Sequence, residues 1–200
     1  MAFLFIKNFF RQEHADIWFV LGPSGAGKTY FCDFLQNRLN WLHINVDEPY
    51  PPDGDGLDKM KLRRTWNQFF FKLRGRPLVN KIRKKFASFA HYRIVLSFPS
   101  DYVIDESHIR AIQRHVKIIY LYGRQQSCLN AFLEREYASG RSLGEEHWRH
   151  HNLHLYEALD GTSLRPWIIE VFQKDGTRKS AAALYNEIEA LWSSPLSDRI

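Results

Sequence analysis

The segment GPSGAGKT, residues 22–29, constrains the fold of this chain more than any other part of its sequence. It follows an apolar run at 17–21 and leads into a pattern that predicts a helix from residue 28. Glycines permit backbone angles and close approaches that a Cβ would block, so successive N–H groups can point toward one centre. A buried strand, a glycine-rich turn and a helix in this order predict an α/β fold with an anion site at the start of the helix.

The same segment predicts which residues bind nucleotide phosphates. It matches GxxxxGK(S/T), a pattern whose backbone cradles phosphate oxygens and whose lysine, here Lys28, reaches the β- and γ-phosphates. The hydroxyl of Thr29 is expected to ligate Mg²⁺, which prefers oxygen ligands and bridges phosphate oxygens. We therefore expect ATP and Mg²⁺ as cofactors. The expected cofactor-binding residues of this segment are Gly22, Pro23, Ser24, Gly25, Ala26, Gly27, Lys28, Thr29 and Tyr30.

Short apolar runs alternate with helical patterns along the rest of the chain. The runs are almost continuously apolar, as in parallel strands that are buried on both faces. We expect strands at 17–22, 41–46, 92–98, 116–122 and 166–172. We expect helices at 28–39, 58–73, 78–90, 102–115, 125–139, 145–159 and 179–192. This alternation predicts an α/β protein, a three-layer α/β/α sandwich around a five-stranded parallel sheet, with ligands at the carboxyl ends of the strands.

Length and composition predict a single domain over residues 1–200. Hydrophobic residues make up 44% of the chain, enough for a core, and no apolar run approaches the ~18 residues of a membrane span. The two cysteines, Cys32 and Cys128, show neither metal-site nor redox spacing. The N-terminal segment lacks the sustained apolar core and the cleavage site of a signal peptide. We therefore expect a cytoplasmic protein without membrane contact.

The residues at the ends of the second and third expected strands indicate which class of nucleotide-binding protein the chain resembles. The third strand ends in LSFPSD, with Ser97 where large P-loop ATPases usually have an aspartate, and no NKxD guanine motif is present. The second strand instead ends in a carboxylate, within HINVDEPYPPDGDGLDKM. Here the chain resembles the small-molecule P-loop kinases, the group that contains shikimate kinase, gluconate kinase and the nucleoside monophosphate kinases. The stretch DGDGLDKM is loosely similar to the acidic segment that follows this strand in gluconate kinases.

The resemblance implies a role for the first carboxylate after the second strand. In these kinases an acidic residue there faces the acceptor and the metal, which maps onto Asp47 as a catalytic residue and metal ligand. The chemistry agrees, because an acceptor hydroxyl needs a carboxylate within hydrogen-bond reach to take its proton. Glu48, Asp53 and Asp55 are weaker candidates. Asp47 could instead serve only in the Mg²⁺ shell, or be a turn residue before Pro49.

The resemblance also implies a lid and an adenine-binding loop. Such kinases carry lid arginines after the fourth strand, which maps onto Arg135 and Arg141 in a lid-type helical region at 124–159. A closing lid expels water that would otherwise hydrolyse ATP. The alternative for both arginines is a solvated helix face and a flexible loop. After the fifth strand, the residues expected to pack the adenine base are Lys174, Asp175, Gly176 and Thr177, and a plain turn with Thr177 as helix cap explains that loop almost as well.

Positive charge is concentrated in one part of the chain. Of the 28 Lys and Arg residues, 12 lie between Lys59 and Arg93, a segment without Asp or Glu, while the other 16 stand against 22 acidic residues elsewhere. We interpret residues 50–91 as a basic helical insert that binds the acceptor, because this charge favours an anionic partner. The alternatives are a solvated face over an ordinary core, nucleic-acid binding through phosphates, and a membrane-surface role.

Four histidines fall on one face of the helix expected at 145–159. They are His147, His150, His151 and His154. Pairs at i, i+4 can ligate a metal, but no carboxylate stands between these histidines and no sulfur ligand is near. We expect instead a face near the anionic site, or packing with Trp148 and Tyr156.

Together these features predict an ATP- and Mg²⁺-dependent kinase that transfers the γ-phosphate to a hydroxyl or phosphate of a small, anionic acceptor. Its catalytic residues would be Lys28, Asp47, Arg135 and Arg141. Two other hypotheses stay open. One is a nucleic-acid end kinase that uses the basic 59–93 segment. The other is a non-catalytic or regulatory nucleotide-binding module, favoured by Ser97 in place of an acidic residue.

Overall fold

The structure is a computed structural model. It describes residues 17–46, 75–85, 93–98, 115–141, 144–160 and 168–193. The helix expected at 58–73 lies outside the described residues, as does the helix expected at 102–115 except for its last residue.

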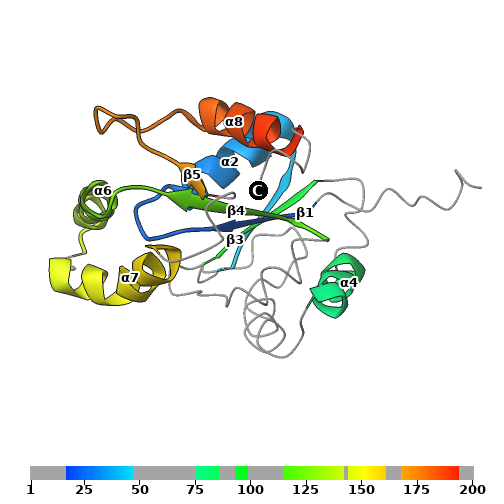
Figure 1. The fold of residues 1–200 in the computed structure, drawn as a ribbon, viewed down its shortest axis with the longest axis horizontal. Helices are drawn as coiled ribbons and strands as arrows, with labels where there is room; N and C mark the ends of the chain where they lie inside the picture. The colour runs from blue at the N-terminus through cyan, green and yellow to red at the C-terminus, as the bar shows by residue number, and fades with distance from the viewer. Residues whose placement is uncertain are drawn as a thin grey trace, which may run out of the picture.

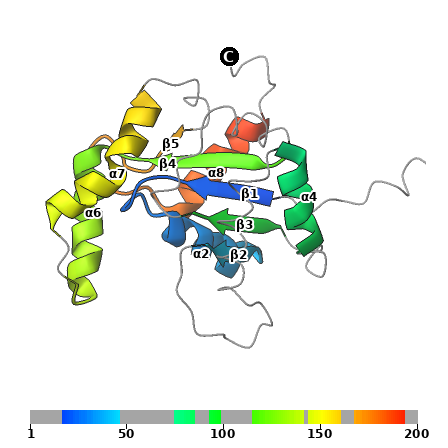
Figure 2. The same ribbon diagram turned by 90° about the horizontal axis from the view of Figure 1, so that it is seen from below.

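Five parallel strands form one sheet in the order β2-β3-β1-β4-β5, which confirms the predicted sheet. The strands are β1 (Ile17–Leu21), β2 (Leu42–Asn45), β3 (Ile94–Ser97), β4 (Lys117–Tyr122) and β5 (Ile168–Glu170). In the register of β1 and its neighbour β3, Val20 near the end of β1 pairs with Ser97 at the end of β3. The loops that follow these strands therefore leave the sheet at neighbouring points of the same edge (Figure 2).

The central strand, β1, is buried along its whole length. Trp18 packs against Trp41 with ring centroids 4.6 Å apart, and Phe19 packs against Phe98 with centroids 5.1 Å apart. Successive side chains of a strand point to opposite faces, so these two pairs fill the core on opposite sides of the sheet. Burying an apolar side chain of this kind contributes about 1.5–3 kcal/mol, which explains why the run is apolar at every position.

Helices cover both faces of the sheet, as predicted for a three-layer sandwich (Figure 1). On one face, α2 (Lys28–Leu39) packs on β2 and β3, and α8 (Ala181–Ser193) packs on β5 and α2. On the other side lie α4 (Gly75–Lys85) and α7 (Glu145–Asp160). The remaining helix of the described chain, α6 (Gln125–Ala138), contacts α7 beyond the carboxyl ends of the strands.

Backbone geometry explains where α2 and α4 begin. α2 lies between Gly27 (φ 84°) and Asn40 (φ 57°), both in the left-handed region that interrupts a helix. α4 begins at Gly75, three residues before the expected start at 78, just after Pro77. In the structure Pro77 lies in the first turn of the helix. A proline is tolerated there, since the N–H that it lacks would have no partner within the helix.

Candidate active site

The predicted phosphate loop connects β1 to α2 at the carboxyl edge of the sheet (Figure 2). Gly25 has a φ of 79°, and a Cβ at this position would overlap the carbonyl oxygen of Cys128. Gly27 has a φ of 84°, and a Cβ there would overlap the guanidinium group of Arg178. Both positions require glycine, so the sequence pattern and the packing of distant segments together fix the shape of this loop.

Lys28, the first residue of α2, turns its ammonium group back over the loop. Its Nζ donates hydrogen bonds to the carbonyl oxygens of Gly22 at 2.7 Å and of Pro23 at 3.0 Å. The first turn of α2 carries no acidic side chain, so the ammonium group adds to the partial positive charge of the helix N-terminus. This arrangement suits a phosphate ligand, and phosphate binding by Lys28 stays a prediction.

Asn152 of α7 contacts the phosphate loop, and the sequence analysis missed it. Its Oδ1 accepts a hydrogen bond from the Ser24 N–H at 2.9 Å, and its Nδ2 donates to the Trp148 carbonyl oxygen at 2.9 Å. The side chain is fully buried. Because both ends of the amide are engaged, Asn152 fixes the loop relative to α7. In the sequence, the only indication of this contact was the asparagine itself, which stands among the histidines of the helix expected at 145–159.

Arg178 is a second contact that the sequence analysis missed. Its Nη2 donates a hydrogen bond to the Gly25 carbonyl oxygen at 2.7 Å, and its Cζ lies 5.3 Å from the centroid of the Phe172 ring. The hydrogen bond and the cation–π contact hold a positive charge at the rim of the phosphate loop. Arg178 directly follows Thr177 in the sequence. Its positive charge next to the expected adenine loop could have indicated a role in nucleotide binding.

The expected adenine-binding loop folds as a tight turn after β5. The backbones of Phe172 and Arg178 form an antiparallel bridge, and the Gln173 N–H donates to the Thr177 carbonyl oxygen at 2.7 Å. Within the turn, Asp175 Oδ1 accepts hydrogen bonds from the N–H of Thr177 at 2.9 Å and from its hydroxyl at 2.7 Å. These two hydrogen bonds also lower the pKa of Asp175. The loop is thus held in shape by its own side chains.

Thr177 does not cap the helix that follows, so that part of the plain-turn alternative is wrong. The Oγ of Ser180 accepts a hydrogen bond from the Ala183 N–H at 3.1 Å, which is the contact of an N-cap residue. α8 accordingly begins at Ala181, two residues after the expected start at 179.

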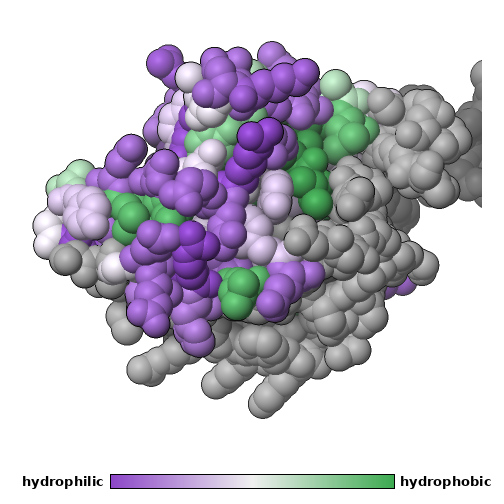
Figure 3. Space-filling view, turned by 60° about the vertical axis from the view of Figure 1, so that its left-hand side comes forward, coloured by the Kyte–Doolittle hydropathy of each residue, from purple (hydrophilic) through white to green (hydrophobic). Residues whose placement is uncertain are grey.

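Two cavities lie beside this turn. The larger has a volume of about 820 Å³, within the usual range for ligand pockets, and is lined by Asp175, Gly176 and Thr177 together with Arg135 and Arg178. The expected adenine loop and one expected lid arginine therefore face the same space. At this end of the molecule the surface is mostly hydrophilic, with small hydrophobic areas (Figure 3).

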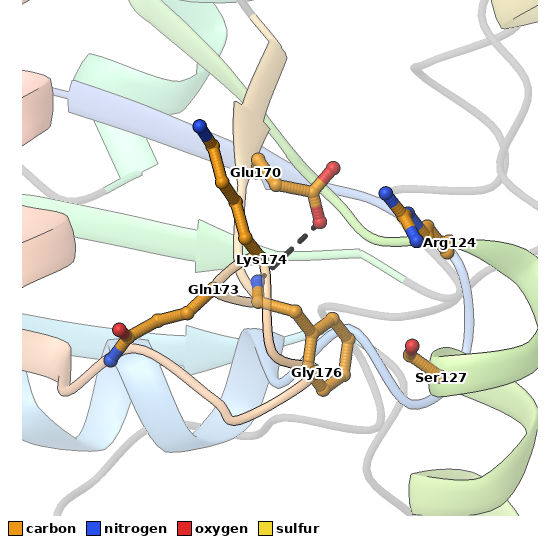
Figure 4. A pocket seen from close by; sticks show the side chains of 7 residues that line it. Arg124, Ser127, Glu170, Gln173, Lys174 and Gly176 are labelled. Atoms are coloured by element: carbon orange, nitrogen blue, oxygen red, sulfur yellow. Dashed lines mark hydrogen bonds between the residues drawn. The ribbon is translucent and has the colours of Figure 1, made fainter.

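The smaller cavity, about 150 Å³, contains an acidic group (Figure 4). Glu170, at the end of β5, lies between Arg124 and Lys174, and its Oε1 accepts a hydrogen bond from the Phe172 N–H at 3.4 Å. Burial raises the pKa of Glu170, while this hydrogen bond and the charges of Lys179 and Arg124 lower it in part. A carboxyl group near this turn provides a hydrogen-bonding partner for an amino group, such as the one on adenine.

The two predicted lid arginines meet at Glu136, a carboxylate that the sequence analysis missed. Glu136 Oε1 accepts hydrogen bonds from Arg135 Nε at 3.0 Å and Nη2 at 2.7 Å, and Arg141 Nε lies 3.1 Å from Oε2. The Glu136 side chain is 2% exposed, whereas those of Arg135 and Arg141 are 61% and 68% exposed. The structure thus brings both arginines together, with solvent on one side and a buried anion on the other.

Other predicted residues have simpler surroundings. Thr29 and Tyr30 are exposed in the first turn of α2, and the Tyr30 hydroxyl accepts a hydrogen bond from the Ala181 N–H at 3.4 Å. Asp47, the predicted catalytic carboxylate and metal ligand, lies outside the described residues, as do Glu48, Asp53 and Asp55.

Of the four histidines on α7, the structure describes the side chains of His147 and His150, and those of His151 and His154 lie outside the described residues. Among the described residues, no group of three His, Cys, Asp or Glu side chains could hold a metal ion. His147 and His150 are exposed, whereas Trp148 and Tyr156 are buried with ring centroids 6.2 Å apart. The helix therefore turns these aromatic residues toward the core.

The described part of the basic insert lies far from the phosphate loop. α4 is placed beside the amino ends of the strands, while α6 and α7 lie at the carboxyl ends (Figure 2). In agreement, Arg83 Nη2 donates to the carbonyl oxygen of His115, which precedes β4, at 3.4 Å. Any contact of the insert with an acceptor at the phosphate loop must therefore come from its part outside the described residues.

Comparisons with known proteins bear on the fold. No protein-family model matches the chain, and no curated protein sequence matches it significantly. Among solved structures, an uncharacterized protein from Eubacterium ventriosum is 12% identical with a TM-score of 0.51, covering 90% of this chain and 99% of that one. The chain has a P-loop NTPase fold.

Structures similar to this P-loop fold also include small-molecule kinases. Shikimate kinase from Acinetobacter baumannii, in complex with shikimate, is 18% identical with a TM-score of 0.49, covering 95% of this chain and 98% of that one. A gluconokinase from Sinorhizobium meliloti is 16% identical with a TM-score of 0.46, covering 89% and 95%. Both of these solved structures are small-molecule kinases.

None of the helices in the described parts of this P-loop fold is both long and apolar enough to span a membrane.

Proposed function

We propose that this protein is an ATP-dependent kinase that transfers the γ-phosphate to a hydroxyl or phosphate group of a small, anionic acceptor. The observation that carries the proposal is the phosphate loop between β1 and α2. Its glycines accept no Cβ, and Lys28 folds its ammonium group over it. The cavity beside the turn after β5 is lined by Arg135 and by Arg178, which contacts the phosphate loop at Gly25, and it provides room for the rest of a nucleotide.

The cations around this loop suit phosphoryl transfer, which depends on positioning and charge neutralisation more than on covalent chemistry. Lys28 would bind the β- and γ-phosphates. Arg178, fastened to Gly25 at the rim, would face the phosphate chain, and Arg135 and Arg141 would stabilise the transferring group. The turn with Asp175, Gly176 and Thr177 would pack the adenine base.

The residues at the start of α2 fit a magnesium ion. The exposed hydroxyl of Thr29 adjoins Lys28, and Asp47 follows β2, so both would supply the oxygen ligands that Mg²⁺ prefers. The ion would neutralise charge on the phosphate oxygens when bound. Asp47 would also orient the acceptor and take the proton from its hydroxyl group.

Two supporting proposals concern location and partners. Cys32 and Cys128 are both free and buried, which fits a reducing compartment, so we propose a cytoplasmic protein. Residues 50–74 would contact the acceptor, because α4, the described part of the basic insert, is placed at the opposite end of the sheet.

A second candidate function is a nucleotide-binding module that hydrolyses ATP slowly or not at all. It is favoured by Ser97, a neutral residue at the end of β3 where many P-loop ATPases have an aspartate. The third hypothesis, a nucleic-acid end kinase, would need the basic segment at 59–93. Binding of labelled oligonucleotides to the protein, with an affinity that falls steeply as salt is added, would support this hypothesis.

The decisive experiment is a phosphotransfer panel with γ-labelled ATP and Mg²⁺. The acceptors are sugars, hydroxy acids, nucleosides, nucleoside monophosphates and oligonucleotides with free 5′ hydroxyls. We expect label in one small anionic acceptor, and its loss in Lys28→Met and Asp47→Asn proteins. ATP binding without transfer to any acceptor would favour the regulatory module. Label in oligonucleotides alone would favour the end kinase.

A further inference from the structure

Three polar side chains from α2, β2 and β3 form a continuous hydrogen-bonded chain. Asp33 Oδ1 lies 3.0 Å from His43 Nδ1, and His43 Nε2 lies 2.9 Å from Ser97 Oγ. The Ser97 hydroxyl is also 3.3 Å from Asn45 Oδ1. Asp33, His43 and Asn45 have no role in the site described so far.

The inner end of this hydrogen-bonded chain is buried, which restricts its side chains to one arrangement. The His43 side chain is 6% exposed and Ser97 is 2% exposed, while Asp33 is 49% exposed at the outer end. A buried polar group without a partner is costly, so the imidazole and the hydroxyl hold each other in one arrangement. The sequence signal was a histidine in the middle of an otherwise apolar strand, WLHINV.

Ser97 lies between the two segments that carry the proposed metal ligands. Its carbonyl oxygen accepts a hydrogen bond from the Val46 N–H at 2.9 Å, immediately before Asp47. The following N–H, of Phe98, donates to the Val20 carbonyl oxygen at 3.1 Å, two residues before the phosphate loop. The end of β3 is therefore fixed between the strand that leads to Asp47 and the strand that leads to Lys28.

The helix that carries Asp33 also carries Thr29. The two residues are at positions i and i+4 of α2, so they share one face of the helix. That face meets β2 and β3, because Asp33 contacts His43 there. The hydroxyl group of Thr29 is thus on the same side of α2 as the chain that ends at Ser97.

The proton arrangement follows from the donor and acceptor capacities. An ionised Asp33 can only accept, so His43 Nδ1 donates to it, and Nε2 of the neutral ring then accepts the proton of the Ser97 hydroxyl. The hydroxyl has one proton and two acceptors within reach, His43 Nε2 at 2.9 Å and Asn45 Oδ1 at 3.3 Å, and the proton goes to the nearer acceptor. Once its proton is engaged, Ser97 Oγ presents only lone pairs to other groups, as a carboxylate oxygen does.

We propose that Asp33 and His43 are positioning residues that hold the Ser97 oxygen as a hydrogen-bond acceptor for the water shell of Mg²⁺ in the nucleotide site. Ser97 thereby takes the place of the aspartate that is usual at the end of this strand. The inference rests on the proposed function, since it concerns the metal that accompanies ATP at the same site.

The test compares ATP affinity in Mg²⁺ with ATP affinity in EDTA, by calorimetry on the full chain. In the wild-type protein Mg²⁺ tightens ATP binding. In Ser97→Ala and Asp33→Asn we expect this gain to shrink about tenfold, the usual effect of losing an outer-shell partner, with the affinity in EDTA unchanged. Ser97→Thr, which keeps the hydroxyl, retains the gain. Mn²⁺ in place of Mg²⁺ gives a second readout, because its electron paramagnetic resonance spectrum in the ATP complex should change in the same two variants.

The matched control is Gln36→Ala, which removes a side chain of α2 whose Oε1 accepts a hydrogen bond from the backbone N–H of His43 at 3.3 Å. It should behave as the wild type. Should Ser97→Ala fail to fold, the half-exposed Asp33→Asn carries the test. A full Mg²⁺ effect in the folded variants would overturn the inference and leave the proposed function intact. A wild-type protein that binds no ATP in either condition would overturn both.

Discussion

The amide oxygen of Asn152 accepts a hydrogen bond from the Ser24 N–H at 2.9 Å, between residues 128 positions apart in the chain. This bond ties α7, a helix of the expected lid region, to the phosphate loop. Because the amide nitrogen also donates to Trp148, one buried side chain couples the backbone of the helix to the backbone of the loop. Movement of α7 would therefore move the loop.

Replacing Asn152 by alanine should weaken both stability and ATP binding. The change removes the acceptor of the Ser24 N–H and opens a small cavity, which should cost about 1–3 kcal/mol of unfolding free energy. ATP affinity should fall roughly fivefold to tenfold, the equivalent of one hydrogen bond. Urea unfolding and calorimetric titration measure the two effects. Leu153→Ala, an exposed neighbour on α7, is the control, and equal ATP affinity in both variants would contradict the coupling.

Lys28→Met should reduce ATP affinity by at least tenfold. Methionine keeps the length and the apolar stem of lysine but loses the charge-assisted hydrogen bonds to phosphate, each of about 1.5–3 kcal/mol. Calorimetric titration with ATP provides the measurement. The control is Lys84→Met, which removes an equal charge from an exposed position of α4, at the opposite end of the sheet, and should bind ATP normally. Unchanged binding in Lys28→Met would contradict the proposed site.

The sheet and the phosphate loop were predictable because their signals are local. A central strand such as β1 is buried on both faces, so every residue in it is apolar. The loop has glycine where its backbone adopts positive φ angles, which other residues rarely adopt. Asn152, Arg178 and His43 could not be assigned in this way. Their partners in the site are 128, 153 and 54 residues away, so only the folded chain brings them together.

The lid arginines illustrate the same limit. Resemblance indicated Arg135 and Arg141, but nothing in the spacing of EREYASGR showed that the intervening Glu136 would be the buried one. An acidic residue on a helix is usually solvated. Here Glu136 is buried and forms ion pairs with two guanidinium groups, one on the same helix and one in the loop that follows it.

Glu136→Gln should loosen the lid region and destabilise the protein by about 1–3 kcal/mol. A neutral amide accepts weaker hydrogen bonds from guanidinium groups than a carboxylate does, and it cannot serve both arginines equally. Urea unfolding measures the stability, and limited trypsin cleavage after Arg141 reports whether the loop is freed. Glu134→Gln, on the exposed side of the same helix, is the control. Wild-type stability together with wild-type cleavage would show that Glu136 does not anchor the arginines.

The stability of the protein should fall between about pH 9 and pH 11 because of Cys128. Burial raises the pKa of this thiol from 9.0 to about 11, although its hydrogen bond with Tyr156 and the charge of Arg178 oppose the shift. The folded chain then holds the proton over a pH range in which the unfolded chain releases it. The thiol's contribution to stability is therefore complete below pH 9 and is lost as the pH rises through about 11. Two pKa units correspond to about 2–3 kcal/mol.

Cys128→Ala isolates this effect from other groups that titrate at high pH. Urea unfolding of both proteins at pH 8 and pH 10.5 gives the comparison, since the lysines and tyrosines titrate in both. We expect the wild type to lose about 2 kcal/mol more than the variant between these pH values. Equal losses would mean that the thiol titrates in the folded protein as it does in the unfolded chain, contrary to its burial against the phosphate loop.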